Sequence, residues 1–359
     1  MRIFYYLSHY ISHRLAGLAY IELLRGIGHT VLSNLPPDFS AGSPLAAVSP
    51  PDGLSSAQYA FLEGADLVIL HQEPTCYNAI YEALPVLTGK RVIAYAVWEN
   101  EKLAPYFIAP LNRVSAVWTC SEFCRTAIAP HVEQCCVLPH LVRRTAPLAG
   151  DLQWAENILS ASRKADAFVF LSVIDAVNPR KNLRGLLAAF SLLRGITGRP
   201  VRLLLKQYRV KMPLNHLPDI INVTADVSPN RMAALYALCD AYVSAHHAEG
   251  WGLGMSEAMS YGKPVIATGY SGNMDYMTGE NSFPIPYAMR PVSDEQCAKF
   301  PLFGPDMLWA EADMSKLVAA MRRVAEGRYD HILHARAAEI VKRFGLSGVG
   351  ARLAQLLSS

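Results

Sequence analysis

Residues 246–259 have the sequence HHAEGWGLGMSEAM, and the interpretation of the whole chain begins from this stretch. Glu249 lies in a glycine-rich turn, and Glu257 follows eight residues later, in what the pattern predicts to be the first turn of a helix. The apolar run 264–267 comes next and is typical of a short buried strand. The stretch therefore predicts a turn, a helix and a strand, with two carboxylates near the turn.

Length and composition limit the class of protein. The chain has 359 residues, more than one hydrophobic core usually holds, so we expect two domains. Hydrophobic residues make up 52% of the chain and charged residues 18%, which excludes an intrinsically disordered protein. A formal net charge of +3 is too small to indicate nucleic-acid binding. It suits an anionic small ligand or an anionic membrane surface.

Several features predict a cytoplasmic protein. No apolar run approaches the roughly 18 residues needed to cross a bilayer, and residues 1–7 are more typical of a first strand than of a signal peptide. The seven cysteines are odd in number and show no C-x2-C pair, so we expect reduced thiols and no zinc site. The basic pairs 143–144 and 322–323 allow peripheral contact with the inner face of the membrane, although a solvated surface is the simpler interpretation.

Short apolar runs alternate with helical patterns in both halves of the chain, which predicts parallel sheets with helices on both faces. The predicted strands are 3–7, 30–33, 66–70, 91–95, 116–119 and 136–138, then 167–173, 201–206, 220–223, 240–245 and 264–268. Residues 34–57 and 279–306 have the composition of loops, and 335–344 that of a helix. The alternation stops between 139 and 165, where we place the junction between two doubly wound domains.

Polar side chains follow three predicted strands of the first half. Arg14 lies between the first strand and the first helix, where it could meet an anion. His71 and Glu73 follow the third strand, and Glu99 follows the fourth. Ligands bind at the carboxyl ends of strands in doubly wound sheets, so these residues are candidates for ligand contact. Each could equally belong to a solvated turn or a helix cap.

Two adjacent cations open the second half of the chain. Arg180 and Lys181 lie in the sequence NPRKN at 178–182, which follows a strand and opens a predicted helix, where the helix dipole disfavours cations. A bound diphosphate would remove this conflict, because it could use both side chains and the free backbone N–H groups. Solvated surface cations are the alternative. Lys206, at the end of the next strand, is a second candidate for phosphate contact.

The glutamates of the central stretch suit a sugar joined to a diphosphate. A carboxylate at Glu257 can accept two hydrogen bonds from a vicinal diol such as a ribose, although an acid in a first helical turn also simply favours the helix dipole. Glu249 precedes the glycines of 250–254, whose backbone can approach a ligand closely. Gly272 and Asn273 form a second small polar turn after the next strand.

At these residues the sequence resembles the retaining glycosyltransferases of family 4. The E-x7-E element of that family matches Glu249 and Glu257, and EGWGLGMSEAMSYGKPVIAT at 249–268 is close to its usual flanking sequence. NPRKN resembles the family's basic motif. In the first half, YAVWENEKL and AVWTCSEF resemble segments of its bacterial polysaccharide-assembly, mannosyltransferase-like branch.

The resemblance implies the GT-B fold, an α/β architecture of two doubly wound, Rossmann-like domains that face each other across a cleft. We expect an acceptor-side domain over 1–145, a linker over 146–165 and a nucleotide-sugar-binding domain over 166–345. By the same resemblance, the terminal helix within 346–359 packs on the N-terminal domain.

The resemblance also implies roles for individual residues. Lys181, with Arg180, should neutralise the β-phosphate of the donor as it departs, and Glu257 should bind the ribose hydroxyls. Glu249 and the backbone that follows it should hold the donor sugar; this backbone belongs to Gly250, Trp251, Gly252 and Leu253. Neither a metal ion nor another cofactor should be needed, because cations and helix N-termini do that work in this fold.

The chain departs from the family pattern at two places. Asp175 stands where many members have an arginine, and an acid cannot hold phosphate, so Lys206 or Arg180 would have to replace that arginine. Many members also have a histidine near 97–99, where this chain has none. Glu99 is the candidate to replace it on the acceptor side, where His71, Glu73 and Arg14 are also assigned.

The sequence is thus interpreted as a retaining glycosyltransferase of polysaccharide or glycolipid assembly. It would move a hexose, with mannose favoured, from GDP-mannose or a UDP-sugar to a glycan or lipid-linked acceptor. A nucleotide-sugar epimerase on the same fold is one alternative, and it would convert the donor without an acceptor. A non-catalytic partner subunit of a glycan-assembly complex is the other, and it would bind nucleotide poorly.

Overall fold

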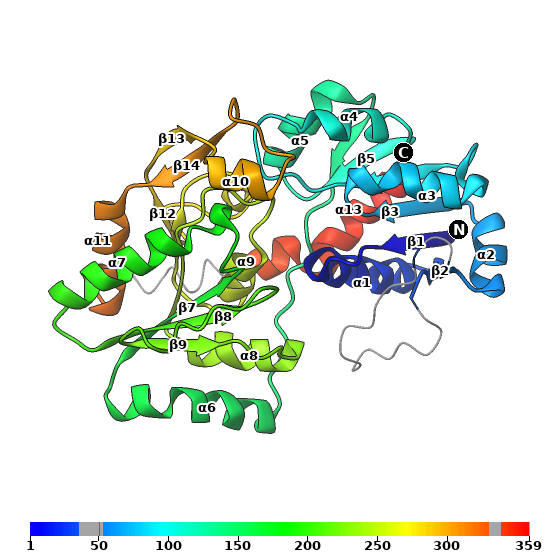
Figure 1. The fold of residues 1–359 in the computed structure, drawn as a ribbon. Helices are drawn as coiled ribbons and strands as arrows, with labels where there is room; N and C mark the ends of the chain where they lie inside the picture. The colour runs from blue at the N-terminus through cyan, green and yellow to red at the C-terminus, as the bar shows by residue number, and fades with distance from the viewer. Residues whose placement is uncertain (36–49, 51–52, 330–338, 359) are drawn as a thin grey trace. The chain divides into compact units, whose positions relative to one another are not determined.

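The computed structural model describes residues 1–35, 50, 53–329 and 339–358. The chain forms two compact units: unit 1 is Met1–Leu141 with Phe344–Ser359, and unit 2 is Val142–Arg343 (Figure 1). Each unit contains a six-stranded sheet whose neighbouring strands pair in parallel. The predicted doubly wound α/β architecture is therefore confirmed in both halves.

Unit 1 has the strand order β2-β1-β3-β4-β5-β6, a flavodoxin-like doubly wound sheet. Its strands are β1 Arg2–Leu7, β2 Thr30–Ser33, β3 Leu67–His71, β4 Val92–Tyr95, β5 Ala116–Thr119 and β6 Cys135–Val137. Its helices are α1 Ile11–Gly26, α2 Ser56–Glu63, α3 Tyr77–Ala83, α4 Pro105–Leu111, α5 Glu122–Ile128 and α13 Leu346–Ser358. The central strands β3 and β4 are buried along their whole length, because helices cover both faces of the sheet.

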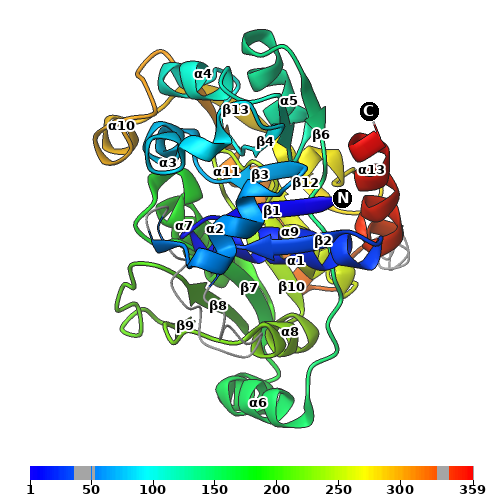
Figure 2. The same ribbon diagram turned by 90° about the vertical axis from the view of Figure 1, so that its right-hand side faces the viewer.

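The last helix, α13, packs against the first, α1 (Figure 2). Gly350 of α13 faces the side chain of Leu23 of α1. Arg352, also in α13, donates a hydrogen bond to the carbonyl of Val137, which is far away in the sequence. The buried positions of α13, which include Val349, Leu353 and Leu356, recur at helical spacing and form the apolar stripe that makes this contact.

Unit 2 has the strand order β12-β11-β10-β7-β8-β9, that of the Rossmann sheet. Its sheet strands are β7 Phe168–Ile174, β8 Val201–Gln207, β9 Ile220–Val223, β10 Ala241–Ser244, β11 Val265–Thr268 and β12 Phe283–Ile285. A separate antiparallel pair consists of β13 Tyr287–Pro291 and β14 Leu308–Ala312. The helices are α6 Ala149–Lys164, α7 Leu183–Ile196, α8 Pro229–Leu238, α9 Leu253–Ser260, α10 Asp294–Lys299 and α11 Met314–Ala325.

The core of unit 2 lies between the sheet and the helices α7 and α11. Phe170 and Leu203 of the sheet, Leu186 and Phe190 of α7, and Met321 of α11 are all buried in one cluster. Helices α8 and α6 lie on the other side of β7, β8 and β9 and pack against each other (Figure 1). Both faces of β7 are thus covered, and its carboxyl end is left to carry polar residues.

Some elements differ from the sequence-based expectation. The segment 279–306, predicted as loop, contains strands β12 and β13 and helix α10. The loop predicted over 34–57 and the helix predicted over 335–344 lie partly outside the described residues. In the part of the chain that the structure describes, no helix has the length and apolar character that a bilayer crossing requires.

Candidate functional site

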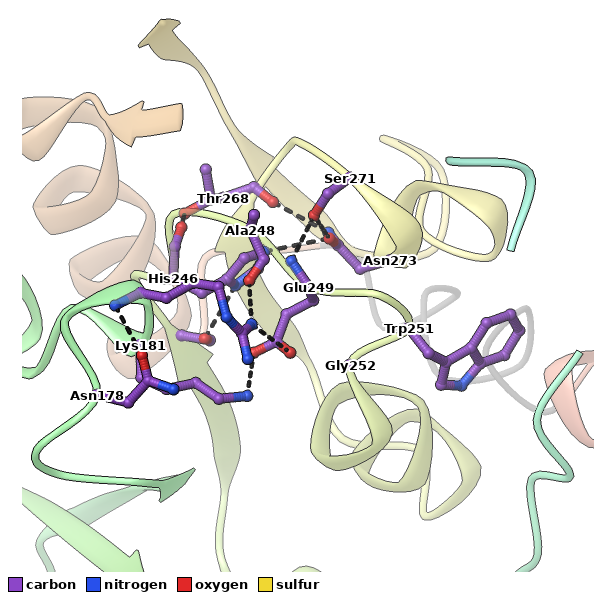
Figure 3. A network of polar contacts seen from close by, with 12 residues as sticks. Asn178, Lys181, His246, Ala248, Glu249, Trp251, Gly252, Thr268, Ser271 and Asn273 are labelled. Atoms are coloured by element: carbon purple, nitrogen blue, oxygen red, sulfur yellow. Dashed lines mark hydrogen bonds and ion pairs between the residues drawn. The ribbon is translucent and has the colours of Figure 1, made fainter. Parts of the chain in front are cut away.

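Three charged side chains from two distant segments meet at the carboxyl end of the unit 2 sheet (Figure 3). Lys181 Nζ donates to Glu249 Oε1 at 2.5 Å, and Arg180 Nη1 donates to Glu249 Oε2 at 3.2 Å. The side chains are largely buried, with exposed fractions of 15% for Lys181, 8% for Arg180 and 10% for Glu249. The structure thus brings together the three residues that the sequence assigned to catalysis.

Electrostatics keep Lys181 and Glu249 ionised. Burial alone would raise the pKa of the Glu249 carboxyl, but Lys181 and Arg180 outweigh it and lower the pKa to about 2. Burial also acts to lower the pKa of Lys181, and Glu249 reverses this effect and raises it. Two cations against one carboxylate leave a net positive charge in a largely buried place. Such a site attracts an anion.

The basic turn is built differently from the expectation. Arg180 and Lys181 lie in a short 3-10 turn, η5 (Pro179–Lys181), and α7 begins only at Leu183. Asn182 adopts a left-handed conformation with φ +50 and caps α7 by accepting from Gly185 N at 2.9 Å. The two cations are therefore outside the helix, and Glu249 offsets one of their two charges. The alternative of solvated surface cations is wrong, since Arg180 is only 7% exposed.

Backbone contacts fix the basic turn on the glutamate loop, which is the segment 245–252 between β10 and α9. Arg180 Nη1 donates to the carbonyl of Ala248 at 2.5 Å, and the N–H of His247 donates to the carbonyl of Arg180 at 2.8 Å. From helix α10, Gln296 Oε1 accepts from Arg180 N at 3.3 Å. The backbone of Arg180 is thus held by two other segments of unit 2, and its guanidinium by the segment of Ala248 and Glu249.

The second glutamate lies further into its helix than predicted. Helix α9 begins at Leu253 after Gly252, whose φ of +86 turns the chain into the helix, so Glu257 is the fifth helical residue. A role as a first-turn acid is excluded by this position. Glu257 Oε2 accepts from the hydroxyl of Tyr236 at 2.8 Å, and burial raises the pKa of Glu257. Tyr236 is a neighbour that the sequence did not suggest.

The side chain of Trp251 forms contacts within the protein. It is buried, and its Nε1 donates to Ser256 Oγ at 3.1 Å. The hydroxyl of Tyr276 lies 2.8 Å from the carbonyl oxygens of both Trp251 and Gly252. These contacts fix the backbone of the Gly250–Leu253 segment. The sequence analysis assigned this backbone to the donor sugar.

The turn at Gly272 and Asn273 belongs to the 3-10 turn η6 (Gly272–Asp275) and supports the glutamate loop. Asn273 Nδ2 donates to the carbonyl of Thr268 at 3.0 Å, and its Oδ1 accepts from His246 Nε2 at 3.1 Å. Glu249 N donates to Ser271 Oγ at 2.8 Å. Both polar ends of Asn273 are thus bonded within the protein, so Asn273 positions the loop that carries Glu249.

His246 is a site residue that the sequence analysis missed, although it stands in the stretch quoted first. It is fully buried, and burial lowers its pKa to about 4, so the imidazole is neutral at pH 7. Its ring bridges Ser244 Oγ, 3.0 Å from Nδ1, and Asn273 Oδ1. The adjacent pair of histidines at the end of a predicted strand was the available signal.

Replacing Gly272 with alanine is expected to destabilise unit 2 and to displace the glutamate loop. The N–H of Gly272 donates to the carbonyl of Glu249 at 2.9 Å, and a Cβ at this position would overlap the backbone carbonyl of Gly250. Overlap with backbone cannot be relieved by a rotamer change, so we expect a loss of about 1–3 kcal/mol. Thermal unfolding of the variant measures this. Gly195→Ala in α7 is the control, because its Cβ meets nothing within 4 Å; equal melting temperatures for the two variants would contradict the assignment.

Lys206 and Asp175 lie at the same end of the sheet. Lys206 is 5% exposed, and its Nζ donates to the carbonyl of Gln207 at 2.5 Å. Burial lowers the pKa of Lys206. Asp175 is 2% exposed and forms an ion pair with Arg209, with 3.4 Å between Oδ2 and Nη1. Arg209 is a second residue that the sequence analysis did not identify.

The candidate residues of unit 1 differ from one another in how deeply they are buried. His71 is the last residue of β3 but lies in the core, where it is 0% exposed and its Nδ1 is 2.8 Å from the hydroxyl of Tyr5. Gly17 of α1 passes over His71 and has no side chain to displace it. Arg14 is buried in α1. His71 thus lies at a strand end that α1 covers, and its assignment to the acceptor side stays a prediction.

Glu73 and Glu99 remain nearer the surface, each partly exposed. Glu73 Oε1 accepts from Thr75 Oγ1 at 2.5 Å, just before the 3-10 turn η2 (Pro74–Cys76), which favours the local-turn interpretation of this residue. Burial lowers the pKa of His13 and Glu99 opposes that shift, so these two groups lie within electrostatic range of each other.

Among the described residues, no group of three or more His, Cys, Asp or Glu side chains has the arrangement of a metal site.

A family model of known proteins matches a part of unit 2. Residues 155–283 match the family model described as Glycosyl transferases group 1. This range holds the basic turn, the glutamate loop and the supporting turn at Asn273. No curated protein matches the chain.

Solved structures of similar fold cover between 84% and 100% of the chain. HepE from Anabaena, in complex with UDP and glucose, is 15% identical, with a TM-score of 0.64 over 100% of this chain and 99% of its own. Sucrose-phosphate synthase from Thermosynechococcus elongatus is 16% identical, with a TM-score of 0.66 over 99% and 98%. The pneumococcal O-GlcNAc transferase GtfA is 13% identical, with a TM-score of 0.55 over 84% and 59%. With two Rossmann-like units, the fold is GT-B, as predicted.

Proposed function

We propose that the protein is a retaining glycosyltransferase that moves a hexose from a nucleotide-sugar to a hydroxyl group of a glycan or lipid-linked acceptor. The observation that carries this proposal is the buried cluster of Arg180, Lys181 and Glu249. The cluster lies in the segment that matches Glycosyl transferases group 1, at the end of the sheet where doubly wound domains bind ligands.

The ion pairs suggest how a donor enters the site. In this structure, Glu249 contacts both cations. A diphosphate carries more charge than one carboxylate and would compete for Lys181 and Arg180, which frees Glu249 to accept hydrogen bonds from the hydroxyls of the donor sugar. Glu257, on the neighbouring helix, is assigned to the ribose hydroxyls. Its bond to Tyr236 would orient the carboxylate for that contact.

The chemical step follows from this placement. The bond between the anomeric carbon and the β-phosphate oxygen breaks, and the acceptor oxygen forms its bond to the same face of that carbon. The acceptor proton passes to the departing diphosphate. Lys181 and Arg180 stabilise the charge that develops on the diphosphate, the term that usually contributes most to catalysis. In this proposal neither a protein nucleophile nor a metal ion takes part.

The donor and the cellular setting are also proposals. GDP-mannose is the donor favoured by the resemblance of the sequence, and UDP-glucose is added because HepE is described in complex with UDP-glucose. The acceptor belongs to polysaccharide or glycolipid assembly, in the cytoplasm or at the inner face of the membrane. Mannosyl or glucosyl transfer would use the same residues for the diphosphate.

A turnover assay tests the function. The protein is incubated in chelator with GDP-mannose, UDP-glucose and UDP-N-acetylglucosamine, first alone and then with alkyl glycosides as acceptors. Slow release of one nucleoside diphosphate, faster with an acceptor and accompanied by an α-linked product, is expected. Conversion of the donor sugar without release would indicate an epimerase. Absence of both binding and release for every donor would indicate a non-catalytic subunit.

A further inference from the structure

The ends of β7 and β8 lie side by side. The strands pair in parallel from Phe168 with Val201 to Ile174 with Gln207, and Tyr208 N donates to the carbonyl of Ile174 at 3.1 Å. Asp175 follows β7 directly, and Arg209 follows Tyr208 after the end of β8. Both residues therefore emerge at the same edge of the sheet.

Arg209 turns back toward Asp175. Its φ of +60 is uncommon for a residue with a side chain, and its guanidinium Nη1 lies 3.4 Å from Asp175 Oδ2. The arginine side chain is 47% exposed, while the carboxylate is 2% exposed. The other oxygen of Asp175, Oδ1, is buried and has no hydrogen-bond partner among the described residues. This is an incompletely satisfied carboxylate beneath a half-exposed guanidinium.

The pair adjoins the basic turn. The N–H of Asn178 donates to the carbonyl of Asp175 at 3.2 Å, and η5 with Arg180 and Lys181 follows directly. Burial raises the pKa of Asp175, and Arg209, Lys181 and Arg180 oppose that shift in this order. All three cations are therefore within electrostatic range of one carboxylate.

We propose that Arg209 binds the diphosphate of the donor together with Lys181 and Arg180, and that Asp175 holds Arg209 at the strand edge until the diphosphate binds. This rests on the proposed function. Arg209 would supply the cation that the sequence lacks at position 175.

Arg209 suits this role better than Lys206. The ammonium group of Lys206 is bonded to a carbonyl and buried, whereas half of the Arg209 side chain is open to a ligand. A guanidinium presents several N–H donors in one plane and can bridge two phosphate oxygens. Its movement from Asp175 to a phosphate exchanges one anionic partner for a more highly charged one. Asp175 remains within electrostatic range of the neighbouring cations of η5.

Isothermal titration of the full chain tests this inference, with UDP, GDP, uridine and guanosine as the probes. Arg209→Ala is expected to weaken the affinity for the nucleoside diphosphate about 10-fold to 100-fold, the usual worth of a charged hydrogen bond, and to leave the affinity for the nucleoside unchanged. Arg202→Ala is the matched control, because Arg202 lies near the opposite end of β8 and pairs with Asp219. The Arg202→Ala variant should bind the diphosphate with the same affinity as the wild-type protein.

The possible failures are distinguishable. If wild-type protein binds neither UDP nor GDP, the proposed function fails and this inference fails with it. If wild-type protein binds one of them and Arg209→Ala binds it equally well, only the inference is overturned.

Asp175→Asn tests the second part, because it keeps the shape of the side chain and removes the charge that competes for Arg209. We expect several-fold tighter binding of the diphosphate and unchanged binding of the nucleoside. Weaker diphosphate binding, in a variant whose melting temperature shows that it is folded, would overturn the role given to Asp175.

Discussion

Turnover of the nucleotide-sugar is expected to fall by about 10²–10³-fold when Lys181 is replaced with alanine, the usual effect of removing one group that stabilises the charge of a transition state. Lys181 is largely buried, Glu249 raises its pKa, and its Nζ contacts the carboxylate of Glu249. The leaving diphosphate would take the place of that carboxylate. The measurement is the steady-state release of the nucleoside diphosphate, with donor affinity determined separately by calorimetry.

Lys316→Ala is the control for this loss. Lys316 is an exposed lysine in the first turn of α11, within the same unit, and its removal changes the net charge by the same amount. We expect wild-type turnover from it. If Lys181→Ala keeps both its turnover and its donor affinity, the assignment of the basic turn to the diphosphate is wrong.

Replacing Glu249 with glutamine is expected to abolish most of the activity and to destabilise unit 2 by about 3–5 kcal/mol, the usual cost of leaving buried charges without their partner. Lys181 and Arg180 would lose the carboxylate that both contact. For a unit the size of Val142–Arg343, this corresponds to a fall in melting temperature of about 10 °C. Glu311→Gln is the control, because Glu311 is half exposed and contacts only His247 among the ion pairs of this unit's described residues.

The same carboxylate makes stability depend on pH. The pKa of Glu249 is about 2 in the folded protein and 4.5 without its partners, so its contribution is present above pH 4.5 and is lost as the pH falls toward 2. At about 1.4 kcal/mol per pKa unit, this contribution is roughly 3 kcal/mol. The difference in melting temperature between wild-type protein and Glu249→Gln should therefore shrink between pH 7 and pH 3. A difference that stays constant over that range would contradict the ion-pair account.

The sheet strands could be predicted because their residues are buried on both faces. Strands such as β3 and β7 are short, continuous apolar runs between turn residues, which marks them in the sequence. The pair β13 and β14 has no such mark. Most of β13 is exposed, its partner lies about twenty residues away, and prolines at 286 and 291 stand beside or at the ends of the strand. Its pairing is decided by tertiary structure.

The site residues of unit 2 could be predicted because they follow strands, and parallel strands bring their carboxyl ends to one edge. What the sequence could not show is which charges pair. The bond between Lys181 and Glu249 spans 68 residues, and the contact between Arg209 and Asp175 depends on the register of β7 with β8 and on a positive φ. The burial of His71 at the end of β3 has a related cause. Gly17 lets α1 pass directly over it, which no local pattern around His71 reveals.

A structure of the protein with its nucleoside diphosphate tests the central claim most directly. The account predicts that the terminal phosphate lies within about 3 Å of Lys181 Nζ, and that Glu249 Oε1 has left the 2.5 Å contact that it makes with that atom in the present structure. A nucleotide bound elsewhere, with the contacts of Glu249 to Lys181 and Arg180 intact, would contradict it.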